Sequence, residues 1–208
     1  MLSPEAFLRR GPVLPVVTIR EAAHGPPLAR ALLAGGVATI EVTLRTPAAL
    51  EAIRAIAAEV PQMELGAGTI LNPADAQAAA AAGARFLVSP GLTPTLLAAA
   101  RGFPVPLVPG VATASEAMTA REAGFRFLKL FPAEAVGGRA LLQSLSGPLA
   151  DLRFCPTGGV SLASAPEYLA LPNVVCVGGS WLAPEAALAA GDWGRITALA
   201  AEAAALRV

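Results

Sequence analysis

Lysine is almost absent from this sequence. The chain has 208 residues, its 15 Lys and Arg balance its 15 Asp and Glu, and Lys129 is the one lysine beside 14 arginines. The net charge is zero, and no stretch of the chain gathers basic residues. Because clustered cations are what bind a nucleic-acid backbone, this balance argues against nucleic acid as a partner.

Histidine and cysteine are also scarce. His24 is the one histidine, so a His-rich zinc site cannot be built. We predict neither a metal nor a cofactor, and a carboxylate-bound magnesium ion stays open as the alternative. Cys155 and Cys176 lie in apolar runs, which favours buried, reduced thiols over a disulfide framework.

Long hydrophobic runs are missing as well. The N-terminal segment has no extended apolar stretch of the kind that a signal peptide needs. The longest uncharged run, 168–184, is interrupted by Pro172 and by Gly178-Gly179, and it falls short of the roughly 20 apolar residues of a membrane span. We therefore expect a soluble, cytoplasmic protein with no membrane partner.

Short apolar runs alternate with segments rich in Ala and Leu, a pattern typical of βα units with a parallel sheet. Ser3 predicts the start of a short N-terminal helix, and Asn72 and Gly83 bound another helix. Thr113 and Glu116 have the spacing of a capping box. The predicted strands are Val13–Ile19, Val37–Leu44, Met63–Thr69, Phe86–Ser89, Val105–Pro109, Phe125–Phe131, Leu152–Thr157 and Val174–Val177.

Eight such units define the expected fold class. They average 208/8 = 26 residues, which is within reach of a (β/α)8 barrel, whose lower size limit is roughly 200 residues. We predict a single α/β barrel domain over residues 1–208, a TIM barrel with a short N-terminal helix. A doubly wound open sheet is the alternative.

The predicted strand 37–44 alternates apolar residues at even positions with polar residues at odd positions. Because strand side chains alternate between faces, the polar set, which includes Glu41 and continues to Arg45, points away from the helices. In a barrel this places Arg45 near the C-terminal end, where barrel active sites lie. A Glu–Arg pair that only satisfies itself in the core, or an edge strand facing solvent, is the alternative.

The predicted strand 125–131 places Lys129 on the same face as Phe127 and Phe131. Apolar surroundings disfavour the charged ammonium form, and a free amine is a nucleophile towards ketones. A snorkelling or ion-paired lysine is the alternative. However, arginine occupies all 14 other cationic positions and cannot form a Schiff base, so the one retained amine predicts a catalytic Lys129.

Two glycine pairs follow the last two predicted strands. Gly158-Gly159 comes after the seventh strand, and Gly178-Gly179, followed by Ser180, comes after the eighth. Barrels frequently bind phosphate in these two loops through backbone N–H groups. We therefore predict a phosphate site there, although tight turns use glycine for other reasons too.

Taken together, these motifs resemble the 2-keto-3-deoxy-6-phosphogluconate aldolase family, also called the 4-hydroxy-2-oxoglutarate aldolase family. The resemblance spans nearly the whole chain. It rests on Gly11-Pro-Val-Leu-Pro-Val, Ala34-Gly-Gly, Glu41-Val-Thr-Leu-Arg-Thr46, Gly66-Ala-Gly-Thr69, Ser89-Pro-Gly91, Pro109-Gly110, Lys129-Leu-Phe-Pro-Ala-Glu134, Arg153-Phe-Cys-Pro-Thr-Gly-Gly159 and Gly178-Gly-Ser-Trp181.

The resemblance implies a metal-free class I aldolase on a (β/α)8 barrel, usually a homotrimer. Lys129 would form the Schiff base and Glu41 would be the general acid and base. The implied substrate-binding residues are Arg45 and Thr69 for the pyruvyl carboxylate, Pro90 and Phe131 lining the pocket, Thr157 beside the substrate chain, and Gly158, Gly159, Gly179 and Ser180 around the phosphate.

The implied reaction cleaves 2-dehydro-3-deoxy-6-phosphogluconate to pyruvate and D-glyceraldehyde 3-phosphate, and 4-hydroxy-2-oxoglutarate to pyruvate and glyoxylate. A sister aldolase for the galactonate epimer is one alternative, and Thr157 looks more like the gluconate enzyme. A phosphosugar isomerase or a non-catalytic sugar-phosphate sensor, with Lys129 as a plain counter-charge, is another.

Overall fold

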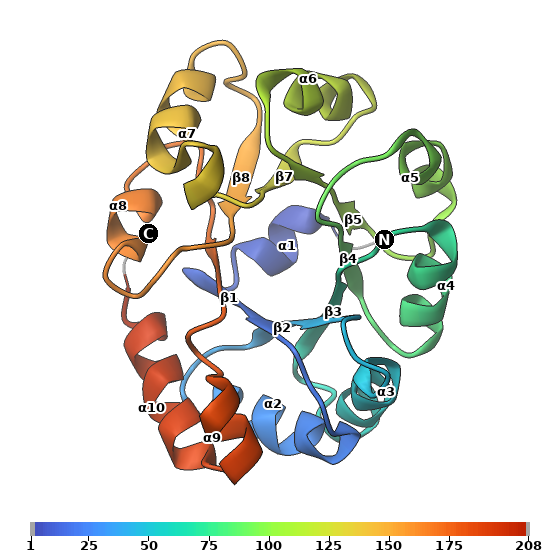
Figure 1. Ribbon diagram of the computed structural model, residues 1–208, viewed down its shortest axis with the longest axis vertical. Coiled ribbons are helices and arrows are strands. Elements are labelled where there is room, and N and C mark those ends of the chain that lie inside the picture. Colours follow the sequence, from blue (N-terminus) through green and yellow to red (C-terminus); the bar gives the residue numbers. More distant parts are fainter. Residues whose placement is uncertain (1–2, 207–208) are drawn as a thin grey trace.

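A curled parallel sheet with helices around its outside forms the body of the protein. A computed structural model describes residues 3–206, so residues 1, 2, 207 and 208 of the predicted domain lie outside the described residues. Figure 1 shows the strands around a common centre, with the helices arranged outside them and α1 (Pro4–Leu8) near the middle. This arrangement differs from a doubly wound sheet, which carries helices on both faces.

The predicted alternation of strands and helices is confirmed. Seven of the eight predicted apolar runs contain a strand that is shorter than the run, whereas the last strand, β9, begins at the final residue of the predicted run Val174–Val177 and continues to Gly179. In residues 3–206 the strands are β1 (Val13–Val17), β2 (Thr39–Thr43), β3 (Glu64–Gly68), β4 (Phe86–Val88), β5 (Leu107–Val108), β6 (Gly110–Val111), β7 (Phe127–Leu130), β8 (Arg153–Pro156) and β9 (Val177–Gly179).

The fifth predicted run is divided into two strands at Pro109. β5 pairs with β4, whereas β6 pairs with β7. Proline has no backbone N–H to donate to a ladder, so the pairing is interrupted at Pro109 and the chain pairs with a different strand after it. The single strand predicted over 105–109 is therefore wrong in detail, because the run continues past Pro109 and changes its partner.

All named strand pairs are parallel and fall into two sheets. One sheet has the order β5-β4-β3-β2-β1-β9, and the other has the order β6-β7-β8. Isolated parallel bridges also join Phe154 of β8 to Val174, and Thr157, just after β8, to Gly178 of β9. Parallel pairing brings the C-terminal ends of the strands to one edge, so the loops that follow the strands lie together.

The helices between the strands begin where the sequence predicts caps. Ser3 accepts a hydrogen bond from the N–H of Glu5, and Thr113 and Glu116 form the predicted capping box. Among residues 3–206, no helix combines the length and apolar character needed to cross a bilayer. After α1, the α-helices are α2 (Gly25–Ala34), α3 (Ala49–Glu59), α4 (Pro73–Ala81), α5 (Pro94–Ala99), α6 (Ala114–Glu122), α7 (Gly138–Ser146), α8 (Ala165–Leu169), α9 (Glu185–Ala190) and α10 (Trp193–Ala204), with 3-10 turns η1 (Ala22–His24), η2 (Ala100–Gly102) and η3 (Glu134–Val136).

Two apolar clusters fill the molecule. The larger one, the outer cluster, joins outward-facing strand residues, such as Ile40 and Leu128, to the helices. The smaller cluster lies inside the curled sheet, where Phe7 of α1 stacks on Phe86 with ring centroids 4.0 Å apart. α1 and this inner cluster thus fill part of the interior with apolar side chains. Glu64, at the start of β3, is a buried polar group outside that cluster and pairs with Arg10 at 3.5 Å.

Candidate active site

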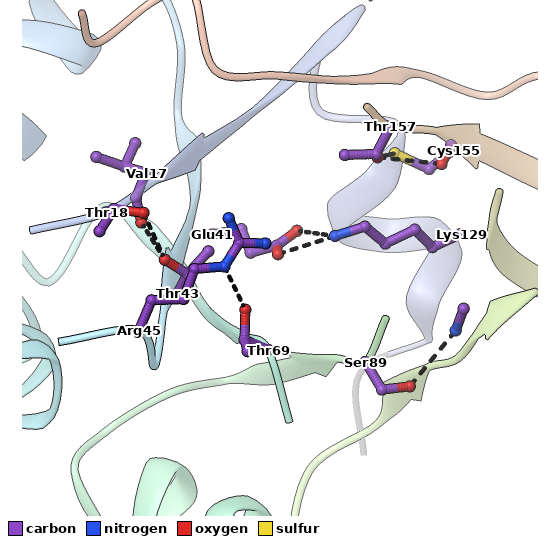
Figure 2. A network of polar contacts seen from close by, with 11 residues as sticks. Val17, Thr18, Glu41, Thr43, Arg45, Thr69, Ser89, Lys129, Cys155 and Thr157 are labelled. Carbon is purple, nitrogen blue, oxygen red and sulfur yellow. Dashed lines mark hydrogen bonds and ion pairs between the residues drawn. The ribbon is translucent and has the colours of Figure 1, made fainter. Parts of the chain in front are cut away.

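Lys129 and Glu41 meet inside the curled sheet. Lys129 lies on β7 and Glu41 on β2, 88 residues apart in the sequence, and Lys129 Nζ donates to Glu41 Oε1 at 3.1 Å. The second carboxylate oxygen lies 3.5 Å from the amine. Figure 2 shows the two side chains reaching toward each other from separate strands. The pair therefore joins two strands through the interior of the sheet.

Strand alternation explains why both side chains point inward. On β7 the neighbours Leu128 and Leu130 belong to the outer cluster, and on β2 Ile40 and Val42 do so too. Because successive side chains point to opposite faces, the residues between them face the interior. This is the direction that the sequence pattern predicts for Glu41 and for the single lysine.

The pair is buried almost completely. Lys129 is 3% exposed and Glu41 is 1% exposed, so each charge lacks water and has the other as its counter-ion. The ring of Phe131 adds a contact, with its centroid 5.3 Å from Nζ. Before substrate binds, the pocket thus holds an amine and a carboxylate that can exchange one proton at hydrogen-bond distance.

Two glycines allow close approaches near this pair: Gly68 leaves room for the Glu41 carboxylate, and Gly110 leaves room for the backbone of Pro90. A Cβ on Gly68, at the end of β3, would lie 2.0 Å from Oε1 of Glu41. A Cβ on Gly110, which pairs with Lys129 in the sheet, would lie 2.3 Å from the carbonyl of Pro90. The backbone of Pro90 therefore lies against β6, the strand that pairs with β7 at Lys129.

Arg45 and Thr69 form a second polar pair, just beyond the ends of β2 and β3. Arg45 Nε donates to Thr69 Oγ1 at 3.0 Å. Thr69 has φ = 61°, a left-handed conformation that is rare and strained for a β-branched residue. This strained backbone turns the hydroxyl to the guanidinium. Figure 2 shows both this pair and the Glu41–Lys129 pair within the same network.

The two predicted phosphate turns lie on neighbouring segments. Thr157 is buried, forms a parallel bridge with Gly178, and donates its hydroxyl to the carbonyl of Cys155 at 3.3 Å. Gly158 and Gly159 both have positive φ, 98° and 85°, so this turn requires glycine. Gly178 and Gly179 do not follow the last strand as the sequence predicts, because both lie within β9 and pair with β1, and the loop begins at Ser180.

A cleft of ≈ 350 Å³ opens beside these groups. Arg45 from the loop after β2 and Ser180 from the loop after β9 both line it. Thr18 and Arg20, after β1, line it too but are not among the residues predicted from the sequence. The period-two alternation of side chains, applied to the predicted strand Val13–Ile19, places Thr18 on the same face as Leu14 and Val16, and this signal could have identified it.

A second cavity, of ≈ 380 Å³, is lined by segments of α5, η2 and the turn after α6 and contains none of the predicted site residues.

Two thiols lie in the inner cluster. Cys155 and Cys176 are buried and free. A hydrogen bond with Cys155 and burial raise the pKa of Cys176, which keeps its thiol protonated and unreactive. Within the described part of the chain, no group of three or more His, Cys, Asp and Glu side chains is placed to hold a metal ion.

Comparison with known proteins gives a consistent result. The chain is 54% identical over 203 residues to the 2-dehydro-3-deoxy-phosphogluconate aldolase of Dickeya dadantii, covering 98% of this chain and 95% of that protein. It is 53% identical over 201 residues to the KHG/KDPG aldolase of Escherichia coli K12, covering 97% and 94%. A crystal structure of the KDPG aldolase from Legionella pneumophila, with pyruvate captured as a covalent carbinolamine, superimposes with a TM-score of 0.96 at 44% identity, covering 98% of this chain and 99% of that one.

The curled α/β fold and the buried amine–carboxylate pair define an enzyme of the lyase class, an aldolase. The model of one aldolase family, KDPG and KHG aldolase, matches residues 5–199. The chain belongs to this family, and the resemblance seen in its motifs is confirmed.

The space beside Glu41 gives a test of the packing. Gly68→Ala places a Cβ against the Glu41 carboxylate, and overpacking of this kind costs about 1–3 kcal/mol. We expect urea unfolding to report that loss in the free energy of unfolding. Gly102→Ala is the control, because a Cβ there meets no atom within 4 Å, and its effect should stay within about 1 kcal/mol. Equal stability of the two variants would contradict the close approach.

Proposed function

We propose that this protein is a class I aldolase that needs no metal and cleaves 2-dehydro-3-deoxy-6-phosphogluconate to pyruvate and D-glyceraldehyde 3-phosphate. The same site would cleave 4-hydroxy-2-oxoglutarate to pyruvate and glyoxylate. The observation that carries the proposal is the buried Lys129–Glu41 pair, with 3.1 Å between amine and carboxylate, in a member of the aldolase family.

Formation of the Schiff base begins with a proton transfer inside the pair. Glu41 takes a proton from the Lys129 ammonium, and the neutral amine attacks the C2 ketone of the substrate. Protonated Glu41 then supplies the proton with which the C2 oxygen leaves as water. The product of these steps is an iminium on Nζ and an ionised Glu41.

The iminium accepts the electron pair when the C3–C4 bond breaks. Glu41, directly or through one water, removes the proton of the C4 hydroxyl as the aldehyde forms and leaves. The remaining enamine takes this proton from Glu41 at C3. Water then hydrolyses the resulting iminium, which releases pyruvate and regenerates the amine of Lys129.

The surrounding residues bind the two anionic ends of the substrate. Arg45 offers a planar guanidinium suited to a carboxylate, and Thr69 offers a hydroxyl held 3.0 Å from it. Pro90, Phe131 and Thr157 border the substrate chain. At the other end, Gly158, Gly159, Gly179 and Ser180 give the phosphate backbone N–H groups and a hydroxyl, from the turn after β8 and from the end of β9.

The fold proposal is a single (β/α)8 barrel over the whole chain. The bridges between Phe154 and Val174 and between Thr157 and Gly178 support it at one join of the two sheets. The continuous segment from β5 through Pro109 to β6 supports it at the other. Free, buried thiols fit a reducing compartment, and on this ground we place the enzyme in the cytoplasm.

The Schiff base can be tested with borohydride. Wild-type protein incubated with pyruvate and borohydride should gain one reduced pyruvate adduct per chain, located on Lys129. Lys129→Arg is the matched control, because arginine keeps the positive charge beside Glu41 but cannot form an imine. It should form no adduct and lose aldol cleavage. Intact mass and peptide mapping measure the adduct, and an adduct or turnover in the arginine variant would refute the assignment.

The role of Glu41 can be separated from that of the lysine. Glu41→Gln keeps the shape and a hydrogen-bond acceptor for Lys129 but cannot accept the C4 hydroxyl proton. We expect kcat to fall by roughly 10²–10⁴, the usual contribution of a general acid or base. Borohydride should still trap pyruvate on Lys129, but more slowly than in the wild type, because Glu41 also moves the protons when the Schiff base forms. Steady-state kinetics measure the loss. Turnover close to that of the wild type would show that another group moves the proton.

We also propose that the protein is a homotrimer. Leu71 and Met118 are large apolar side chains that are 57% and 50% exposed in the single chain, and a partner subunit would cover such groups. Light scattering should give three times the chain mass of 20.9 kDa. Leu71→Arg and Met118→Arg should shift the mass towards the monomer, whereas a monomeric wild type would refute the proposal.

A further inference from the structure

The turn at Gly158-Gly159 has no side chains of its own that could restrict its backbone conformation. Both residues have positive φ, and Gly159 is exposed. Glycine has no side chain to restrict it, and its conformational freedom is the largest of any residue. A phosphate site made of backbone N–H groups works only when the groups are held in place before the ligand arrives. Neighbouring residues must therefore fix this turn.

The segment after Lys129 supplies the neighbours. The N–H of Ala133 donates to the carbonyl of Thr157 at 2.8 Å, and the N–H of Glu134 donates to the carbonyl of Gly158 at 3.1 Å. The stem of Glu134 packs on the turn as well, since a Cβ on Gly159 would lie 2.4 Å from Cγ of Glu134. Glu134 thus contacts the turn through both its backbone and its side chain.

Glu134 is itself an exposed residue and needs a partner to stay in one rotamer. Tyr168 of α8 provides it, because its hydroxyl donates to Oε1 of Glu134 at 2.7 Å. Tyr168 is 1% exposed and belongs to the outer cluster, so its position is fixed by packing. Burial and the bond to Glu134 raise the pKa of Tyr168, so the hydroxyl keeps the proton that it donates.

Gly138, at the start of α7, completes this arrangement. It has φ = 51°, and a Cβ there would lie 2.6 Å from the hydroxyl oxygen of Tyr168. A side chain at this position would push the hydroxyl away from Glu134. The hydrogen bond between Tyr168 and Glu134 thus depends on three features. Gly138 leaves room for the hydroxyl, Gly159 leaves room for the stem of Glu134, and core packing fixes the ring of Tyr168.

We propose that Glu134 and Tyr168 are positioning residues that hold the Gly158-Gly159 turn in its phosphate-binding conformation. They act through the turn and do not touch the substrate. The bond to Tyr168 also fixes the Glu134 carboxylate, which would repel a phosphate dianion if it swung over the turn. The inference rests on the proposed function, because it assigns the pair to the phosphate end of that substrate.

The consequence is selective for phosphorylated substrates. Tyr168→Phe removes only the hydroxyl, so the turn becomes mobile while Lys129 and Glu41 keep their places. For 2-dehydro-3-deoxy-6-phosphogluconate we expect KM to rise about tenfold with kcat changed less than about twofold. For 4-hydroxy-2-oxoglutarate, which has no phosphate, we expect kcat/KM to stay within about twofold of the wild type.

The experiment compares both substrates across a small set of variants. Glu134→Ala removes the stem and the acceptor and should repeat the effect, which also covers a Tyr168→Phe protein that does not fold. Glu134→Gln retains an amide oxygen that accepts from Tyr168, so KM should return towards the wild-type value. Glu167→Gln, which removes the ion pair with Arg139 from the surface of the same helix, is the control and should leave both substrates unchanged.

The outcomes separate this inference from the proposed function. If the wild type forms no pyruvate adduct and cleaves neither substrate, the proposed function and the inference both fall. If the wild type cleaves both, but Tyr168→Phe and Glu134→Ala change both substrates equally, lower kcat in place of raising KM, or change nothing, the inference alone is wrong.

Discussion

The rest of the site depends on one ion pair, Lys129 with Glu41, almost wholly removed from water. Either charge alone would be expensive to bury, so the fold must keep the two strands that carry them at a fixed separation. Parallel pairing fixes each strand against its neighbours, and Gly68 leaves room for the carboxylate. The result of this arrangement is an amine and a carboxylate within proton-transfer distance, with Phe131 beside the amine.

The interior of the curled sheet is divided along its length. Towards the N-terminal ends of the strands, α1 and the inner cluster fill it with apolar side chains, and Phe7 stacks on Phe86. Towards the C-terminal ends, the polar groups of the strands and loops face the opening. On this side Arg45 and Ser180 line a cleft.

Close approaches of backbone and side chain shape this opening, and glycine makes each one possible. Gly68 admits Glu41, Gly110 admits the carbonyl of Pro90, and Gly178 admits Thr157, since a Cβ added at any of the three would lie within 2.3 Å of that neighbour. The glycines of the motifs thus have two different structural roles. Gly158 and Gly159 have positive φ and turn the chain, whereas Gly68, Gly110 and Gly178 make space for a neighbouring group.

Local patterns in the sequence were enough to predict the order of strands and helices, their caps and the inward direction of Lys129 and Glu41, because period-two alternation and capping are local properties of the chain. They did not predict the change of strand partner at Pro109, the bond between Arg45 and Thr69 or the contact of Tyr168 with Glu134, which lies 34 residues away in the chain. That the lysine and the glutamate face each other at 3.1 Å became visible only in the folded chain. Alternation says which way a side chain points, whereas the distance across the interior depends on the register and curvature of every strand between the two.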